Sequence, residues 1–124
     1  MTPLSVGAAA WSRATDMLQM RIERWDARRD GPLTDLALKQ KIEALGFETS
    51  PRIYPAGARA AAQSDPREGI QGIARGLVKV TVDGESAILG AGDFVLVPAN
   101  ALRLVEVIGA SPAYGFEGAR AATS

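Results

Sequence analysis

Hydrophobic and polar positions alternate in short runs along this chain, the pattern of β-strands that bury one face. In the first clear run, Leu18, Met20 and Ile22 alternate with polar residues. This spacing predicts a strand that ends near Trp25–Asp26. Residues 1–16, which precede it, show no period and are interpreted as an N-terminal arm.

The chain after Phe47 consists almost entirely of strand-like runs separated by turns. The predicted strands span residues 48–54, 69–75, 77–82, 86–89, 94–97, 102–108 and 113–116. The Asp83-Gly84 pair between two of them is a strong signal for a two-residue hairpin. Seven or more short strands at close spacing predict an all-β sandwich, jelly roll or small barrel.

One segment, at about residues 34–45, has the period of an amphipathic helix instead. Its apolar stripe comprises Leu38, Ile42 and Leu45. Thr34 or Asp35 is placed to cap its first turn, and Gly46 follows its last. We therefore expect a single helix in the N-terminal half, packed as a lid or brace against a sheet.

The length of 124 residues suits one domain, which we place at residues 17–118 and follow with a tail at 119–124. Open sheets leave edge strands that need cover, and the arm carries Trp11. We therefore expect a homodimer in which the arm packs across the subunit boundary.

Composition removes several classes of function. Fourteen Lys and Arg balance fourteen Asp and Glu, so no basic excess favours nucleic acid as a partner. The chain has no cysteine and no histidine, which excludes disulfides, imidazole metal sites and catalytic triads with a histidine base. No run approaches the length of a membrane helix and no targeting segment is apparent, so we expect a cytoplasmic protein without a membrane partner.

The block at residues 76–97, with the turn after it, resembles the core of the cupin superfamily. Gly57 and Gly76 fall on the two glycines of the first cupin motif with its spacing intact, and Gly92 and Pro98 match the second motif. Further likeness to short, single-domain bacterial cupins lies in Arg24-Trp25-Asp26 and in the segment after the predicted helix. The resemblance covers about residues 17–117 and implies a cupin-type jelly-roll barrel.

The four positions that hold the metal in cupins are changed in this chain. The resemblance places them at Gln63, Asp65, Gly69 and Arg103. An arginine keeps its proton in proteins and has no acceptor atom, and Gln63 and Asp65 alone supply too few ligands. We therefore expect no metal and no other cofactor.

The resemblance also implies that Arg103 projects into the barrel. A buried guanidinium needs a partner. Asp65 and Glu106 are the two candidates in the chain, and water at the barrel mouth or a carboxylate or phosphate of a ligand is the alternative. Gln63 and Gln71 are expected beside and across from Arg103.

Three aromatic residues alternate with small residues on predicted strands, namely Tyr54, Tyr114 and Phe116. They either line the pocket or belong to the hydrophobic core.

These observations lead to one leading hypothesis and two alternatives. The first is a metal-free, cupin-like domain that binds a small organic molecule, anionic or neutral, in the barrel. The second is a metal-independent isomerase, cyclase or lyase, with Asp65 or Glu106 as acid or base and Arg103 stabilising an anion. The third is a structural homodimer subunit without a ligand. The first two are separated by geometry, because an enzyme needs a carboxylate with a raised pKa converging with Arg103 on one cavity.

Overall fold

A computed structural model describes residues 20–59 and 61–121 of the chain. In chain order the elements are β2 (Arg21–Glu23), α2 (Ala27–Asp30), α3 (Asp35–Glu43), β3 (Phe47–Tyr54), β4 (Gly69–Arg75), β5 (Val78–Val82), β6 (Glu85–Leu89), β7 (Phe94–Val97), β8 (Arg103–Val107) and β9 (Ala113–Arg120). The arm at 1–16, with Trp11, lies outside the described residues.

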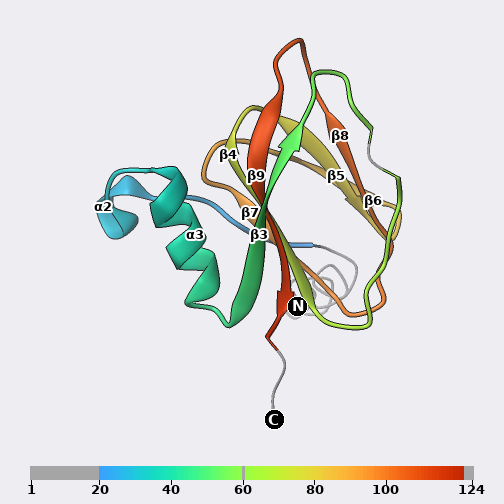
Figure 1. The fold of residues 1–124 in the computed structure, drawn as a ribbon, viewed down its shortest axis with the longest axis horizontal. Coiled ribbons are helices and arrows are strands. Elements are labelled where there is room, and N and C mark those ends of the chain that lie inside the picture. Colours follow the sequence, from blue (N-terminus) through green and yellow to red (C-terminus); the bar gives the residue numbers. More distant parts are fainter. Residues whose placement is uncertain (1–19, 60, 122–124) are drawn as a thin grey trace, which may run out of the picture.

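The strands form two antiparallel sheets that face each other. One sheet has five strands in the order β2-β7-β4-β9-β3, and the other has three in the order β6-β5-β8. Strands that are neighbours in space are mostly distant in sequence, as β4 and β9 are, which is the jelly-roll arrangement. Figure 1 shows the two helices on one side of the five-stranded sheet and the three-stranded sheet on the other. The all-β jelly-roll fold expected from the sequence is confirmed.

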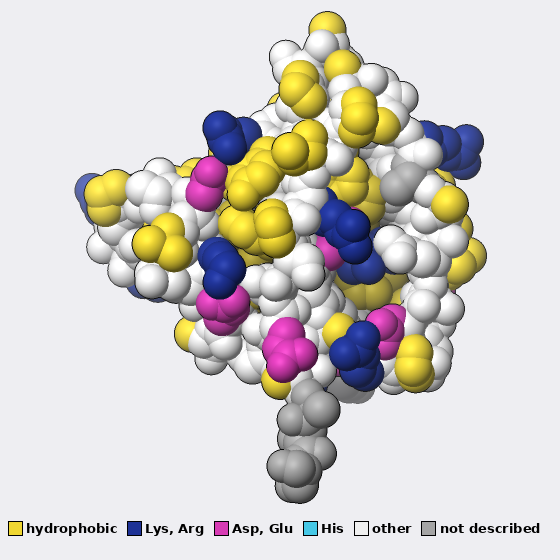
Figure 2. Space-filling view, viewed as in Figure 1, with side chains coloured by type: hydrophobic (Ala, Val, Ile, Leu, Met, Phe, Trp, Pro, Cys, Tyr) yellow, Lys and Arg dark blue, Asp and Glu magenta, His cyan; other side chains and the backbone are white. Residues whose placement is uncertain are grey.

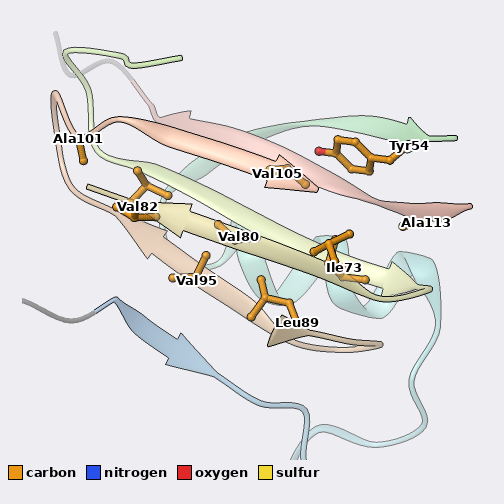
Figure 3. Close-up of a cluster of buried hydrophobic side chains, with 11 residues drawn as sticks. Tyr54, Ile73, Val80, Val82, Leu89, Val95, Ala101, Val105 and Ala113 are labelled. Atoms are coloured by element: carbon orange, nitrogen blue, oxygen red, sulfur yellow. The ribbon is translucent and has the colours of Figure 1, made fainter. Parts of the chain in front are cut away.

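The main hydrophobic core lies between the two sheets. Alternate residues of each strand point inward, so that Val78, Val80 and Val82 of β5 meet Ile73 and Val95 of the larger sheet. Figure 3 shows these inward-pointing side chains together with Tyr54 at one end of the cluster. The Asp83-Gly84 hairpin joins β5 to β6, and both residues have the positive φ angles, 48° and 87°, that this turn requires.

A second core lies on the outer face of the five-stranded sheet, where α3 packs as a brace. Leu38 and Ile42 of the helix are fully buried against Ile70, Phe94 and Phe116. The side chain of Thr34 caps the helix by accepting a hydrogen bond from Ala37. Within the described part of the chain, no helix is long and apolar enough to cross a membrane.

Most predicted elements match the structure to within one or two residues, with three differences. Within the described residues, the first strand ends at Glu23, earlier than the expected end near Trp25, because its pairing with β7 stops there. A second, short helix follows it, where a single helix was expected, since Asp26 caps α2 by accepting from the amide of Arg28. The last strand continues past Phe116 to Arg120, so residues 119 and 120, placed in a tail above, belong to β9.

Candidate functional site

A polar cleft opens between the two sheets at the end where the β7–β8 connection and the loop before β4 meet. It consists of a small cavity of about 60 Å³ and a wider mouth of about 290 Å³ that share five lining residues. The shared residues are Gln63, Asp65, Arg67, Arg103 and Gly118. Figure 2 shows this opening as a hollow to the right of β3, with basic and acidic side chains gathered in it.

Arg103 is the central residue of the cleft. It begins β8, where its backbone exchanges two hydrogen bonds with Gln63, of 2.9 and 2.8 Å. Odd-numbered residues of β8 face the interior, since Val105 is buried opposite Val80 of β5. The guanidinium of Arg103 is therefore directed between the sheets, and its side chain is 12% exposed. The inward position implied by the resemblance agrees with this geometry.

Glu117 of β9 is the carboxylate that faces Arg103. Its Oε1 atom lies 3.8 Å from Nη2 of Arg103 and 3.6 Å from Nε of Arg52. The Glu117 side chain is 11% exposed, whereas that of Arg52 is 57% exposed and lies at the rim. The pair Arg103–Glu117 thus joins the two sheets through their interior.

A hydrogen-bond chain extends from Glu117 into the core. Tyr54 of β3 donates its hydroxyl proton to Oε2 of Glu117, and Nε2 of Gln71 donates to the Tyr54 hydroxyl at 3.0 Å. Burial, and then the hydrogen bond to Glu117, raise the pKa of Tyr54 well above its ordinary value. The phenol therefore stays protonated and acts as a donor. The chain runs across three neighbouring strands, from β4 through β3 to β9.

Asp65 lies at the other side of the cleft, where its carboxylate is hydrogen-bonded to Arg67. Both carboxylate oxygens accept from the Arg67 guanidinium, at 3.1 and 3.0 Å, and Oδ1 also accepts from the Arg67 amide. These hydrogen bonds lower the pKa of Asp65 to about 2. Asp65 is therefore ionised at neutral pH and has no proton to donate.

The low pKa of Asp65 leads to a test by NMR titration. We expect its carboxyl to titrate near pH 2, and the substitution Arg67→Met to return the pKa toward the ordinary value of 3.8. A lowered pKa favours the folded state above 3.8, and this contribution is lost as the pH falls toward 2. Arg28→Met, which removes an arginine of α2, is the control and leaves the titration unchanged. A pKa near 3.8 in the unaltered protein would show that the ion pair does not form in solution.

Two predicted pocket residues lie on the wrong face of the sheet. Phe116 is buried beneath α3, and Tyr114 packs beside it with the ring planes at 69°. Their strand places Ala113, Gly115 and Glu117 toward the barrel interior, so the two aromatic rings point outward. The prediction that Tyr114 and Phe116 line the pocket is wrong, and their alternative, core packing, holds.

Glu106 is also not part of the cleft. It alternates with the inward-facing Val105 and Val107, and its carboxylate pairs with Arg59 at 3.2 Å on the outside of the barrel. Neither Glu106 nor Asp65 is the ion-pair partner of Arg103, which is Glu117. Gln63, Asp65 and Arg103 do come together in the cleft, and Gln71 lies deeper, 0% exposed.

Sequence reasoning missed Glu117, Arg52 and Arg67. Glu117 was left out because the predicted strand stopped at Phe116. The alternation of side chains along a strand could have identified Glu117. Ala113 and Gly115 lie on one face of β9, and Glu117 is the next residue on that face. No comparable signal identified Arg52 or Arg67, which reach the cleft only through the folding of β3 and of the loop before β4.

Comparison with solved structures decides the family. A cupin protein from Bacteroides fragilis is 31% identical, with a TM-score of 0.54, and the match covers 64% of this chain and 70% of that one. The chain belongs to the cupin superfamily. A cupin-like protein from Thermotoga maritima (20% identity, TM-score 0.55, covering 65% of this chain and 62% of that chain) and an RmlC-like cupin from Shewanella frigidimarina (18%, 0.52, 61% and 68%) share the fold. No family model and no curated protein matches the chain.

The four positions at which the resemblance places the metal ligands of cupins all line the small cavity, but their residues do not suit a metal. Arg103 brings a positive charge to one ligand position, and Arg67 occupies both oxygens of Asp65 at another. At the third, Gly69 offers no side chain, and Nη1 of Arg103 lies 3.8 Å from where a Cβ would stand. No group of three or more acidic side chains converges within residues 20–59 and 61–121. The side chains at these positions therefore do not fit a divalent metal ion.

Proposed function

We propose that this cupin binds a small organic acid in the cleft, without a metal ion, and that Arg103 receives its carboxylate. The observation that supports the proposal is the incomplete hydrogen bonding of the Arg103 guanidinium. A guanidinium has five N–H donors. Among the described residues, the Arg103 guanidinium donates one hydrogen bond, a long one of 3.4 Å to the backbone oxygen of Ile70. Its contact with Glu117, at 3.8 Å, is ionic and exceeds hydrogen-bond length.

Buried polar groups that lack partners are costly, so proteins rarely retain them without a role. Nε of Arg103 is buried and has no hydrogen-bond partner among the described residues. A carboxylate fits a guanidinium in a bidentate arrangement and accepts two such donors at once. A ligand carboxylate at this position satisfies donors that the protein itself leaves free.

Charge and space in the cleft are consistent with an acid of modest size. The cluster of Arg52, Arg103 and Glu117 has two positive charges against one negative, which a single carboxylate neutralises. The whole lining of the mouth, which adds Arg67, Asp65 and Glu48, is balanced at three charges of each sign. The mouth, at about 290 Å³, is close to the lower end of the range for small-molecule sites. Asp65 and Arg67 neutralise each other at the opposite wall.

The enzymatic alternative has less support. Its acid or base was Glu106, which points away from the barrel, or Asp65, whose pKa is lowered to about 2 rather than raised. A general acid at neutral pH needs a pKa near 7. Binding without chemistry is therefore the function we propose.

Titration of the protein with butanoate, followed by amide NMR shifts, tests the proposal. We expect saturable shifts at Gly69 and Gly118 beside the cleft, at millimolar acid and neutral pH. Arg103→Met is expected to reduce the affinity at least about tenfold, because a charge-assisted hydrogen bond contributes about 1.5–3 kcal/mol.

Two controls separate specific binding from other effects. Arg28→Met removes an exposed arginine of α2 and is expected to bind butanoate like the unaltered protein. Treatment with a chelator is expected to leave the affinity unchanged. Shifts that do not saturate, or an Arg103→Met variant with full affinity, would overturn the proposal.

A further inference from the structure

We infer that the ligand carries an ammonium group as well as a carboxylate, as an amino acid does, and that Glu48 binds this ammonium group in the mouth of the cleft. The inference rests on the proposed binding of a carboxylate at Arg103. Its basis is the position and charge of Glu48, which lines the mouth together with Arg103. Among the residues that the structure describes, Glu48 is the only carboxylate of the mouth without an ion-pair partner.

The charges of the mouth balance in number but are not all paired. Asp65 is paired with Arg67 at 3.0 Å. Glu117 lies between Arg103 and a second arginine at the rim, at 3.8 and 3.6 Å. One positive charge therefore remains in excess beside Glu117, and one negative charge remains at Glu48.

A ligand with a carboxylate alone answers only half of this arrangement. Its carboxylate neutralises the excess positive charge at Arg103 and leaves Glu48 as a like charge in the same mouth. A zwitterion places a negative group at the guanidinium and a positive group at Glu48. An ammonium group has three N–H donors, and an ionised carboxylate only accepts, so the two are matched.

The register of the sheet places Glu48 across the floor of the cleft from Arg103. Ala119 of β9 is the direct neighbour of both Glu48 on β3 and Gly69 on β4. Glu48 and Gly69 are therefore two strand spacings apart, about 10 Å. On the Gly69 side, Nη1 of Arg103 lies 3.8 Å from where a Cβ would stand. A small molecule lying over the methyl group of Ala119 thus has the guanidinium on one side and the Glu48 carboxylate on the other.

Glu48 is also accessible to a ligand. It shares a face of β3 with Tyr54, which points into the barrel, but it is exposed where Tyr54 is buried. A ligand therefore reaches Glu48 through the mouth without entering the hydrophobic core. Because solvent screens an exposed ion pair, we expect the contribution of Glu48 to affinity to be about fivefold rather than larger.

The experiment compares acids that differ in the ammonium group. Butanoate, 2-aminobutanoate and 4-aminobutanoate are titrated at neutral pH and low ionic strength into the unaltered protein and into Glu48→Gln, with the amide NMR shifts of Gly69, Gly118 and Ala119 as the readout. We expect at least one amino acid to bind the unaltered protein about fivefold more tightly than butanoate. Glu48→Gln keeps the size of the side chain and removes its charge, so it is expected to bind the three acids alike.

The matched control is Glu23→Gln, the same change at an exposed glutamate of β2. This strand is at the opposite edge of the five-stranded sheet from β3. The control therefore changes the net charge of the protein by the same amount and is expected to keep the preference.

The possible results separate this inference from the proposed function. If both amino acids bind the unaltered protein no more tightly than butanoate, the ammonium inference is overturned and the proposed function stands. A preference that persists undiminished in Glu48→Gln overturns the role of Glu48. Failure of all three acids to bind overturns the proposed function, and this inference with it.

Discussion

Arg103→Leu is expected to lower the free energy of unfolding by about 2–4 kcal/mol in urea denaturation, although it places an apolar side chain in a largely apolar barrel. The reason is Glu117, whose carboxylate remains between the sheets after its partner is removed. Arg52 and Tyr54 still contact Glu117, so we expect the loss to fall in the lower half of this range.

A second substitution shows whether the loss of stability comes from the Glu117 carboxylate that is left without Arg103. The double variant Arg103→Leu with Glu117→Leu is expected to regain at least half of the lost stability, because no buried charge is then left alone. The matched control is Arg59→Leu, which breaks an ion pair with Glu106 on the outer face of the barrel. Exposed pairs contribute little, so this control is expected to change stability by less than about 0.5 kcal/mol. Equal losses in Arg103→Leu and Arg59→Leu would contradict the internal position of Arg103.

Gly76→Ala is expected to have a large effect at a distance from the cleft, with a loss of about 3 kcal/mol or more, or failure to fold. Gly76 has a φ of 91°, a conformation that strains any residue with a Cβ atom. A Cβ there would also stand 2.7 Å from Cα of Ala113 and 2.8 Å from the backbone oxygen of Pro112. These are backbone atoms at the start of β9. The clash can therefore be relieved only by moving the strand that carries Glu117.

Gly57 is the natural comparison, since it is the other glycine of the first cupin motif. Its φ is 71°, but a Cβ added there would meet nothing within 4 Å. Gly57→Ala therefore carries only the cost of the backbone conformation, about 1–2 kcal/mol. Thermal unfolding of the two variants distinguishes crowding from backbone strain. Equal losses of stability in the two variants would mean that the contacts of an added Cβ at Gly76 with Ala113 and Pro112 contribute nothing.

Local pattern was sufficient to predict most of the fold. Strand residues alternate because their side chains point to opposite faces, and the Asp83-Gly84 turn is set by two adjacent positive φ angles. Thr34 located the start of α3 through an interaction that spans only a few residues. The barrel type and the inward position of Arg103 were implied by the resemblance to cupins that the motif glycines carry.

The composition of the site depended on long-range contacts. Alternation states that two faces exist, but not which of them meets the other sheet. The sequence therefore left open whether Tyr114 and Phe116 line the pocket or pack in the core, and Glu117 was not considered. The face is decided by α3, which buries Phe116 on the outer side and leaves Glu117 to point inward. That outcome depends on the packing of residues about 75 positions apart.

The partners of charged side chains were likewise a tertiary matter. By sequence alone Asp65, Glu106 and Glu117 are equivalent carboxylates. Asp65 pairs locally, with Arg67 two residues away. In contrast, Glu106 pairs with Arg59 across an isolated bridge, and Glu117 with two arginines from different strands. The sequence, through alternation and the resemblance to cupins, predicted the barrel and the inward arginine, and it contains no histidine or cysteine. Only the tertiary structure decided which carboxylate faces that arginine, because an ion pair depends on distance in space and burial, and spacing along a strand reports neither.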